Sequence, residues 1–319
     1  MIYIVHDDFT FTRFLLSAFA DRKDIELVPM KLQGYWARRI FSINRKLGFT
    51  VFSPILLNKH AFSIFKKVKP SDTLIFFDYL TYTNVKSILK RTECGNIHFW
   101  FWNTVDKYTS PVFRFRNSYT HFHTFDDADA SKYDMILHRQ IYRMPELKDE
   151  SSLQHDKVDF FFIGKNKGRQ DLLMKMNDMV RAWGYTTRFI ILDKHLKIDS
   201  CDGIEVISKE VDYREVLDMS ERARVLVDIT KKNQVGLTLR CVEGVYLNKK
   251  ILSNNKSLIY SDIYSKENVL VFDDTLKKED VDEFMSCDFR PYDSEVLYKY
   301  SVESWLKNIL AVNTPGPEK

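Results

Sequence analysis

Short apolar runs alternate with amphipathic segments along nearly the whole chain, and this alternation limits the possible folds more than any other feature. Residues 1–5 (MIYIV) and 158–164 (VDFFFIG) are short, continuous apolar runs, typical of strands that are buried on both faces. Residues 169–184 have helical spacing, and Gly184 is a stop signal. Strands that alternate with helices predict an α/β fold built on parallel sheets.

A polar segment, residues 145–157 (PELKDESSLQHDK), divides the alternation into two series. We therefore predict two Rossmann-like domains, residues 1–150 and 157–292, joined by a linker. A last helix, residues 293–311, is expected to pack back toward the first domain. Two such domains face each other across a cleft, and ligands of open α/β sheets bind beyond the carboxyl ends of the strands.

Composition excludes several classes of protein. The net charge of +4 over 319 residues is too small to indicate a partner by itself. No run approaches the roughly 20 apolar residues of a membrane span, and the start of the chain has no basic signal-peptide region. The four cysteines (Cys94, Cys201, Cys241, Cys287) have no CxxC spacing. We therefore expect a cytoplasmic protein with reduced thiols and no metal site.

The first strand-to-helix turn, HDDFTFTR, contains no glycine. A dinucleotide site would need the GxGxxG pattern here, so an NAD or FAD enzyme is disfavoured. The turn instead places His6, Asp7 and Asp8 at the carboxyl end of a strand, and one of them could act as a general base. The alternative is a structural role, with Asp8 or Thr10 capping the helix.

The corresponding turn of the second series, FFIGKNKGRQD, contains glycines and cations. Gly164 permits close approach of the backbone, while Lys165 and Arg169 lie next to a predicted helix N-terminus. Helix amides and basic side chains favour a phosphate. The pattern is not a P-loop, and a solvated basic turn is an equal alternative.

A later loop leads into a helix with a charged pair, in QVGLTLRCVEGVYLNKKILSNN (residues 234–255). Its candidate binding residues are Gln234, Gly236, Thr238, Arg240 and Glu243. Arg240 and Glu243 are i, i+3 neighbours, so an internal ion pair is one interpretation. In the other, Thr238 and Arg240 contact a diphosphate and Glu243 accepts hydrogen bonds from ribose hydroxyls.

The run GLTLRCVEGVYLNKKILSNN resembles the signature of GT-B glycosyltransferases, in particular the CgeB-like group and related bacterial surface-polysaccharide transferases. FFIGKNKGR, FWFWNTV and HTFDDADASKYD are similar to other segments of these enzymes. The resemblance implies a GT-B arrangement in which the second domain holds a nucleotide-diphosphate sugar and Glu243 contacts its ribose. It also implies a base from the first turn and no required metal or other cofactor. Val235 stands where many retaining members carry glutamate, so retaining and inverting chemistry both remain open.

The implied function is sugar transfer to a glycan or lipid-linked acceptor in lipopolysaccharide, capsule or exopolysaccharide synthesis. Lys165, Arg169, Thr238 and Arg240 would balance the charge of the leaving diphosphate. Two alternatives remain: a nucleotide-sugar epimerase or phosphorylase on the same fold, and a non-catalytic membrane-associated binding protein.

Residues 31–69 contain nine lysines and arginines and no acidic residue, with aromatic residues interspersed. Basic and aromatic residues together are typical of a segment that binds an anionic membrane surface. We expect a protein that is peripheral on the inner face of the cytoplasmic membrane. A solvated face over core aromatics is the second interpretation, and nucleic acid, for which we find no motif, is the third and is not expected as a partner.

Overall fold

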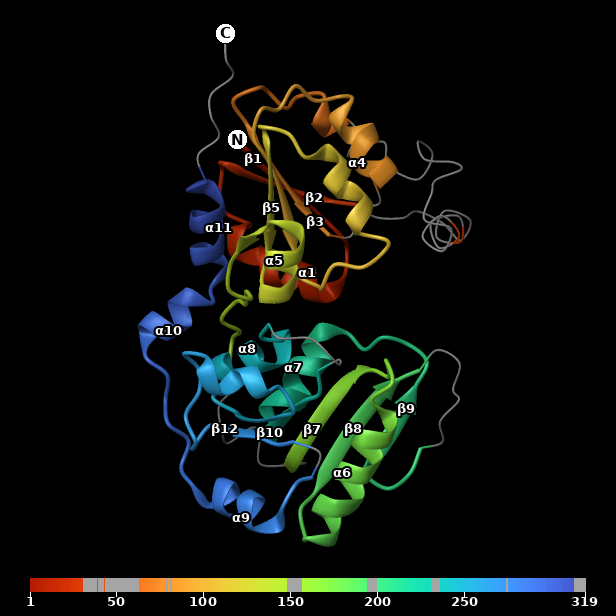
Figure 1. Ribbon diagram of the computed structural model, residues 1–319, viewed down its shortest axis with the longest axis vertical. Helices are drawn as coiled ribbons and strands as arrows, with labels where there is room; N and C mark the ends of the chain where they lie inside the picture. Colours follow the sequence, from red (N-terminus) through yellow and green to blue (C-terminus); the bar gives the residue numbers. More distant parts are fainter. Residues whose placement is uncertain are drawn as a thin grey trace. The chain divides into compact units, whose positions relative to one another are not determined.

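The structure is a computed structural model that describes residues 1–30, 39, 43, 63–78, 80, 82–147, 157–193, 200–230, 236–273 and 275–312. The chain forms two compact units (Figure 1). Unit 1 comprises Met1–Arg139 and the C-terminal segment from Val302, and unit 2 comprises Gln140–Ser301. The boundary in this structure therefore lies just before the polar segment, and residues 293–301 belong to unit 2.

Unit 1 is built on a six-stranded parallel sheet of order β2-β1-β3-β4-β5-β6. Its strands are β1 (Ile2–His6), β2 (Ile25–Pro29), β3 (Thr73–Phe77), β4 (Ile97–Phe101), β5 (Thr120–Thr124) and β6 (Ile136–Leu137). The chain runs outward from β1 to β2 and then returns to the other side of β1 for β3. The topological switch point of this sheet therefore lies between β1 and β3.

Within the described residues, the α-helices that accompany this sheet are α1 (Thr10–Leu16), α4 (Tyr82–Leu89), α5 (Asp127–Tyr133) and α11 (Val302–Leu310). Val85 and Ile88 of α4 join one core cluster with buried strand residues. Trp305 of α11 packs edge-on against Phe77 and Trp100, with ring centroids 5.7 and 5.9 Å apart. The C-terminal helix is therefore an integral part of unit 1, although the rest of the unit comes from Met1–Arg139.

The single last helix expected at residues 293–311 is instead two helices, α10 (Ser294–Lys299) and α11. The chain bends at Tyr300, whose carbonyl accepts a hydrogen bond of 2.7 Å from Tyr142 N. The Tyr300 ring is fully buried. The tertiary hydrogen bond and the buried ring set the break, which periodicity alone does not predict.

A chain of histidines crosses one face of this sheet. His98 Nδ1 lies 2.9 Å from His123 Nε2, and His123 Nδ1 lies 2.8 Å from His138 Nε2. His121 stacks on His98 with a centroid separation of 5.0 Å. Burial lowers the pKa of His98 to about 3 and that of His138 to about 4. These imidazoles are therefore neutral at pH 7.

We predict that this histidine chain makes the protein acid-sensitive. The pKa values are lower in the folded state than the value of about 6.5 in the unfolded chain, so unfolding takes up protons. The contribution of the neutral histidines to the free energy of unfolding is fully present above pH 6.5 and decreases as the pH drops from there toward 4. Each proton taken up on unfolding lowers the free energy of unfolding by about 1.4 kcal/mol per pH unit. Urea denaturation at pH 7, 6 and 5 measures the slope, which His138→Gln should reduce; an equal stability at all three values would contradict the prediction.

Unit 2 repeats the architecture with a six-stranded parallel sheet of order β12-β11-β10-β7-β8-β9. The strands are β7 (Val158–Lys165), β8 (Thr187–Leu192), β9 (Ile204–Ile207), β10 (Ala223–Asp228), β11 (Lys250–Ser253) and β12 (Val269–Val271). The chain reaches β9 on one side of β7 and then returns to place β10 on the other. The switch point of this sheet therefore lies between β7 and β10.

Helices cover both faces of the second sheet. The helices of unit 2 other than α10 are α6 (Gln170–Ala182), α7 (Tyr213–Glu221), α8 (Leu239–Tyr246) and α9 (Lys278–Ser286). Side chains of α6 and α9 join the core cluster on one face of the sheet. Those of α7 pack on the opposite face with Phe161, Ile190 and Leu226. The strands read as continuous apolar runs because both faces are buried.

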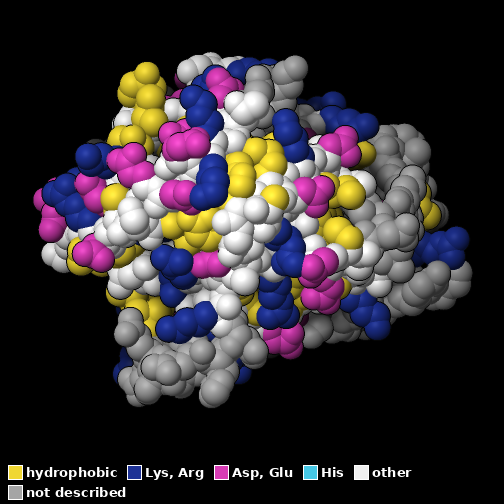
Figure 2. Space-filling view, turned by 90° about the horizontal axis from the view of Figure 1, so that it is seen from below, with side chains coloured by type: hydrophobic (Ala, Val, Ile, Leu, Met, Phe, Trp, Pro, Cys, Tyr) yellow, Lys and Arg dark blue, Asp and Glu magenta, His cyan; other side chains and the backbone are white. Residues whose placement is uncertain are grey.

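Most of the basic stretch at residues 31–69 lies outside the described residues. Of the described part, Lys66, Lys67 and Lys69 are exposed, whereas Phe65 is fully buried in the core of unit 1. On the face shown in Figure 2, positive and negative side chains are interspersed. Within the described ranges, no helix has both the length and the apolar character needed to cross a bilayer.

Candidate functional site

The switch point of unit 2 brings together several predicted binding residues. Gly164 lies at the end of β7, and Arg169 is the residue before α6. Asp228 ends β10, and Thr238 is the N-cap of α8. A crevice at a switch point is where open α/β sheets bind ligands. The two segments that we predicted to bind phosphate therefore meet at one edge of the sheet.

Arg169 is the most unusual side chain at this edge. Its Nε is buried and has no hydrogen-bond partner among the described residues. Burial lowers the pKa of Arg169, while the Asp228 carboxylate acts in the opposite direction. A Cβ at Gly164 would lie 3.5 Å from Arg169 Nη1, so the guanidinium lies against the end of β7. A buried donor without an acceptor is costly, which points to an anionic ligand.

Asp228 organises the start of α8. Its carboxylate accepts hydrogen bonds of 2.8 Å from both Thr238 Oγ1 and Ser253 Oγ. Thr238 Oγ1 also accepts from Cys241 N at 3.3 Å, which caps the helix. The Thr238 side chain is thus used within the protein, but the free amides of the first helical turn remain suited to a phosphate.

Arg240 and Glu243 form a buried ion pair on α8, with side-chain exposures of 15% and 4%. Glu243 also accepts hydrogen bonds from Tyr213 OH at 2.9 Å and Tyr142 OH at 3.4 Å. Arg240 donates to Ile163 O at 3.3 Å, at the end of β7. Burial raises the pKa of Glu243, while Arg240 and both tyrosines oppose this shift. The structure thus contains the internal ion pair, and a ribose would have to displace a tyrosine hydroxyl to reach Glu243.

The hydrogen bonds around Glu243 extend, through Tyr142, to the two points where the chain passes from one unit to the other. Tyr142 follows the first crossing by three residues, and Tyr300 and Ser301 precede the second. Tyr142 N donates to Tyr300 O at 2.7 Å, and Tyr142 forms a β-bridge with Ser301. Glu243 therefore connects the helix at the switch point with both crossings.

The remaining predicted residues of unit 2 are placed less centrally. Lys165 is exposed and pairs with Glu210 at 3.1 Å. Gly236 is buried, and its carbonyl lies 3.5 Å from Asn255 Nδ2. Gln234 lies outside the described residues.

In unit 1, the residues of the first turn differ in exposure. His6 and Asp7 are buried, with exposures of 3% and 2%. His6 Nδ1 contacts Asp7 O, which assigns the proton to Nδ1, and burial lowers the pKa of His6. Asp7 Oδ1 accepts from Phe9 N at 3.1 Å. Asp8 is partly exposed and lies 3.7 Å from Arg13 Nε.

Asp78 is a fourth polar residue at this edge, and we did not select it from the sequence. It directly follows β3, and its Oδ2 accepts from Asn103 N at 3.2 Å and from Asn103 Nδ2 at 3.4 Å. Burial, together with the charge of Asp7, raises the pKa of Asp78 to about 7. The available signal is a carboxylate directly after an apolar run, as at Asp7.

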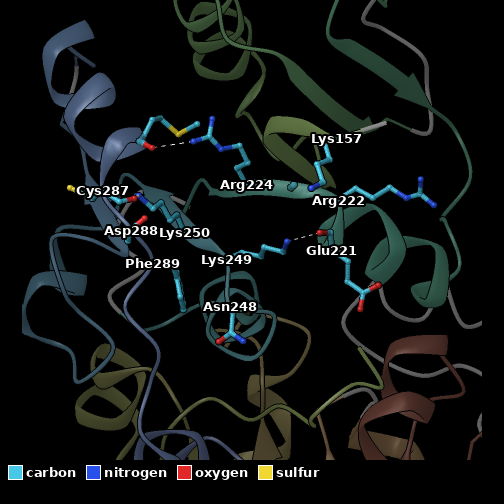
Figure 3. Close-up of a pocket in the computed structure, with 12 residues that line it drawn as sticks. Lys157, Glu221, Arg222, Arg224, Asn248, Lys249, Lys250, Cys287, Asp288 and Phe289 are labelled. Atoms are coloured by element: carbon cyan, nitrogen blue, oxygen red, sulfur yellow. Dashed lines mark hydrogen bonds between the residues drawn. The ribbon is translucent and has the colours of Figure 1, made fainter. Parts of the chain in front are cut away.

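A basic pocket of about 280 Å³ lies at the opposite, amino-terminal edge of the second sheet (Figure 3). Its cations are Lys157, Arg222, Arg224, Lys249 and Lys250. Lys249 Nζ donates to Glu221 O at the end of α7, and Lys250 Nζ donates to Phe284 O in the last turn of α9. Arg224 Nη2 bonds to another carbonyl of α9. Lys249, Lys250 and Arg224 therefore donate hydrogen bonds to carbonyls at helix C-termini, where free carbonyls and the helix dipole favour cations.

No cluster of three or more histidine, cysteine or acidic side chains suited to a metal ion occurs in the described part of the chain. The paired histidines His121 and His123, which share one face of β5, belong to the histidine chain described above.

Comparison with known proteins identifies the fold. No family model matches the chain, and no curated protein matches it in sequence. Among solved structures, an α-glucosyltransferase in complex with UDP-glucose and DNA containing an abasic site matches with a TM-score of 0.58. The identity is 12%, over 97% of this chain and 99% of the other.

Two trehalose-phosphate synthases match as well. A trehalose-6-phosphate synthase has a TM-score of 0.54 at 9% identity, over 98% of this chain and 99% of the other. The UDP-forming α,α-trehalose-phosphate synthase from Burkholderia vietnamiensis has a TM-score of 0.52 at 9% identity, over 97% and 95%. The chain therefore has the fold of the GT-B glycosyltransferases, two parallel six-stranded sheets with helices. The expected CgeB-like subgroup remains a prediction.

Proposed function

We propose that the protein is a glycosyltransferase that moves a sugar from a nucleotide-diphosphate sugar to an acceptor hydroxyl. The observation that carries this proposal is the Arg169 guanidinium, whose buried Nε has no hydrogen-bond partner in the described structure. It lies at the switch point of unit 2, beside the N-terminus of α8. A diphosphate would supply a hydrogen-bond acceptor for Arg169 Nε and negative charge beside the helix N-terminus.

The roles in donor binding follow from position. Arg169 and the first amides of α8 would hold the diphosphate, with Lys165 at the rim. Arg240, on α8, would offset the negative charge of the diphosphate. Glu243 would accept hydrogen bonds from the ribose hydroxyls after a tyrosine hydroxyl moves away. The glycosyltransferases that match in fold support the donor class, since one was solved with UDP-glucose.

For the acceptor, we propose a glycan or lipid-linked sugar in lipopolysaccharide, capsule or exopolysaccharide synthesis, reached at an anionic membrane surface through residues 31–69. This part of the proposal rests on the basic and aromatic composition of that stretch. A DNA acceptor is the second candidate, because the α-glucosyltransferase with the same fold was solved with DNA.

Incubation with a panel of nucleotide sugars, with and without acceptors, tests the proposal. A transferase releases the nucleoside diphosphate and modifies the acceptor, or hydrolyses the donor slowly when no acceptor is present. An epimerase would convert the donor into an isomeric nucleotide sugar, and a phosphorylase would require inorganic phosphate. Glycolipid and DNA acceptors are compared in parallel. If the protein neither binds nor converts any nucleotide sugar, the proposal is wrong.

A further inference from the structure

The basic pocket at the amino-terminal edge of the second sheet is lined by cations from three adjacent strands. Lys157 directly precedes β7, Arg224 lies near the start of β10, and Lys250 begins β11. β10 is hydrogen-bonded to both β7 and β11. The sheet therefore brings three cations from separate parts of the sequence to one pocket of about 280 Å³, which lies entirely within unit 2.

Lys250 lines this pocket although it is only 8% exposed. The partners of its ammonium in the described structure are neutral: the carbonyls of Phe284 and Cys287, and the Phe284 ring, whose centroid lies 4.8 Å from Nζ. No described carboxylate forms an ion pair with it. Burial lowers the pKa of Lys250 and the charge of Arg224 acts in the same direction, against the opposing effect of nearby acidic groups. A buried charge without a counter-charge is costly, so an anion in the pocket would stabilise the ammonium.

The helix C-termini do not account for every cation of the pocket. Lys157 is exposed and makes no hydrogen bond or ion pair with a described residue. Arg224 pairs with Asp159 at 3.0 Å, but its side chain is 53% exposed, and such a pair contributes little to stability. Its guanidinium can therefore turn to a ligand at small cost. Arg222 is not part of this group, since its guanidinium extends away from the other labelled cations in Figure 3.

We propose that this pocket binds a phosphate monoester, carried either by a small soluble molecule or by a phospholipid headgroup. The oxygens of a phosphate match the ammonium groups of Lys157 and Lys250 and the guanidinium of Arg224. The half-buried Phe289 ring forms an apolar wall for the rest of the ligand. The volume is near the lower end of small-molecule pockets, about 300 Å³, which favours a compact ligand. The site lies at the opposite edge of the sheet from the proposed donor site and does not depend on the transferase function.

The test is calorimetric titration of the intact protein with glucose 6-phosphate and with glucose, together with flotation of phosphatidylcholine vesicles with and without phosphatidic acid, whose headgroup is a phosphate monoester. We expect binding only where the phosphate monoester is present. Lys157→Gln with Arg224→Gln should weaken it by about 10- to 100-fold, because hydrogen bonds between charged groups are strong. Arg169→Met, at the opposite edge, should leave it unchanged. Lys175→Gln, at an exposed lysine on α6, is the matched control.

The outcomes distinguish the two sources of the phosphate. Binding of glucose 6-phosphate that the double variant weakens supports a soluble ligand, whereas flotation alone that the double variant weakens supports a phospholipid. If neither kind of binding depends on the pocket cations, they only hold helix C-termini and the proposal is wrong. It is also wrong if Arg169→Met abolishes the binding and the double variant does not. Lys157→Gln alone, at an exposed side chain, decides the question by a smaller decrease if the double variant does not fold.

Discussion

Replacing Arg169 by methionine is expected to weaken nucleoside diphosphate binding by about 10- to 100-fold, since a hydrogen bond to a charged group contributes about 1.5–3 kcal/mol. Methionine retains a long apolar stem beside Gly164 but removes the guanidinium. Because Arg169 Nε has no partner in the described structure, the substitution should cost little stability. Calorimetric titration of both proteins with UDP gives the ratio of the dissociation constants.

The matched control is Arg188→Met, at an exposed position on β8 of the same unit. It removes the same charge from unit 2 without touching the switch point, so binding should be unchanged. If Arg169→Met binds UDP as tightly as the wild type but unfolds more easily, Arg169 has a structural role and the donor site has been placed wrongly.

Glu243→Ala is expected to destabilise the protein by about 3–5 kcal/mol, the usual cost of removing one partner of a buried ion pair. The substitution leaves Arg240 without its carboxylate and removes the acceptor of Tyr213 OH. Urea denaturation at pH 7 measures the loss. Replacing both members, as in Arg240→Met with Glu243→Leu, should recover much of the stability because no uncompensated charge remains.

The double variant also tests the ribose role of Glu243. If it folds and binds UDP as the wild type does, Glu243 only holds α8 and the chain crossings together. If its affinity falls while its stability is near that of the wild type, the pair of Arg240 and Glu243 takes part in nucleotide binding. A stability loss below about 1 kcal/mol for Glu243→Ala would contradict the buried network itself.

The fold could be predicted from the sequence because almost every strand is a short apolar run that ends in polar residues. The strand at residues 158–164 and the helix ending before Gly184 correspond to β7 and α6. The short strand β9 and helix α9 were missed, and the break at Tyr300 depends on a hydrogen bond from Tyr142, more than 150 residues away. Local periodicity contains no information about such long-range contacts.

The candidate site could be predicted only in part, for the same reason. Arg169 was selected because it precedes a helix, and the structure adds that its Nε is buried without a partner. The pair of Arg240 and Glu243 was recognised from its spacing, but Tyr142 and Tyr213 come from distant segments and could not be. Asp78 gains significance only because the sheet order places β3 next to β1.

The central claim, a nucleotide-diphosphate sugar site in unit 2, is tested most directly by calorimetric titration of the intact protein with UDP, GDP, ADP and CMP. The account predicts that at least one of the nucleoside diphosphates binds at one site per chain, more tightly than CMP, which has a single phosphate. It also predicts that this binding is weakened in Arg169→Met. The absence of binding by all four nucleotides would contradict the account.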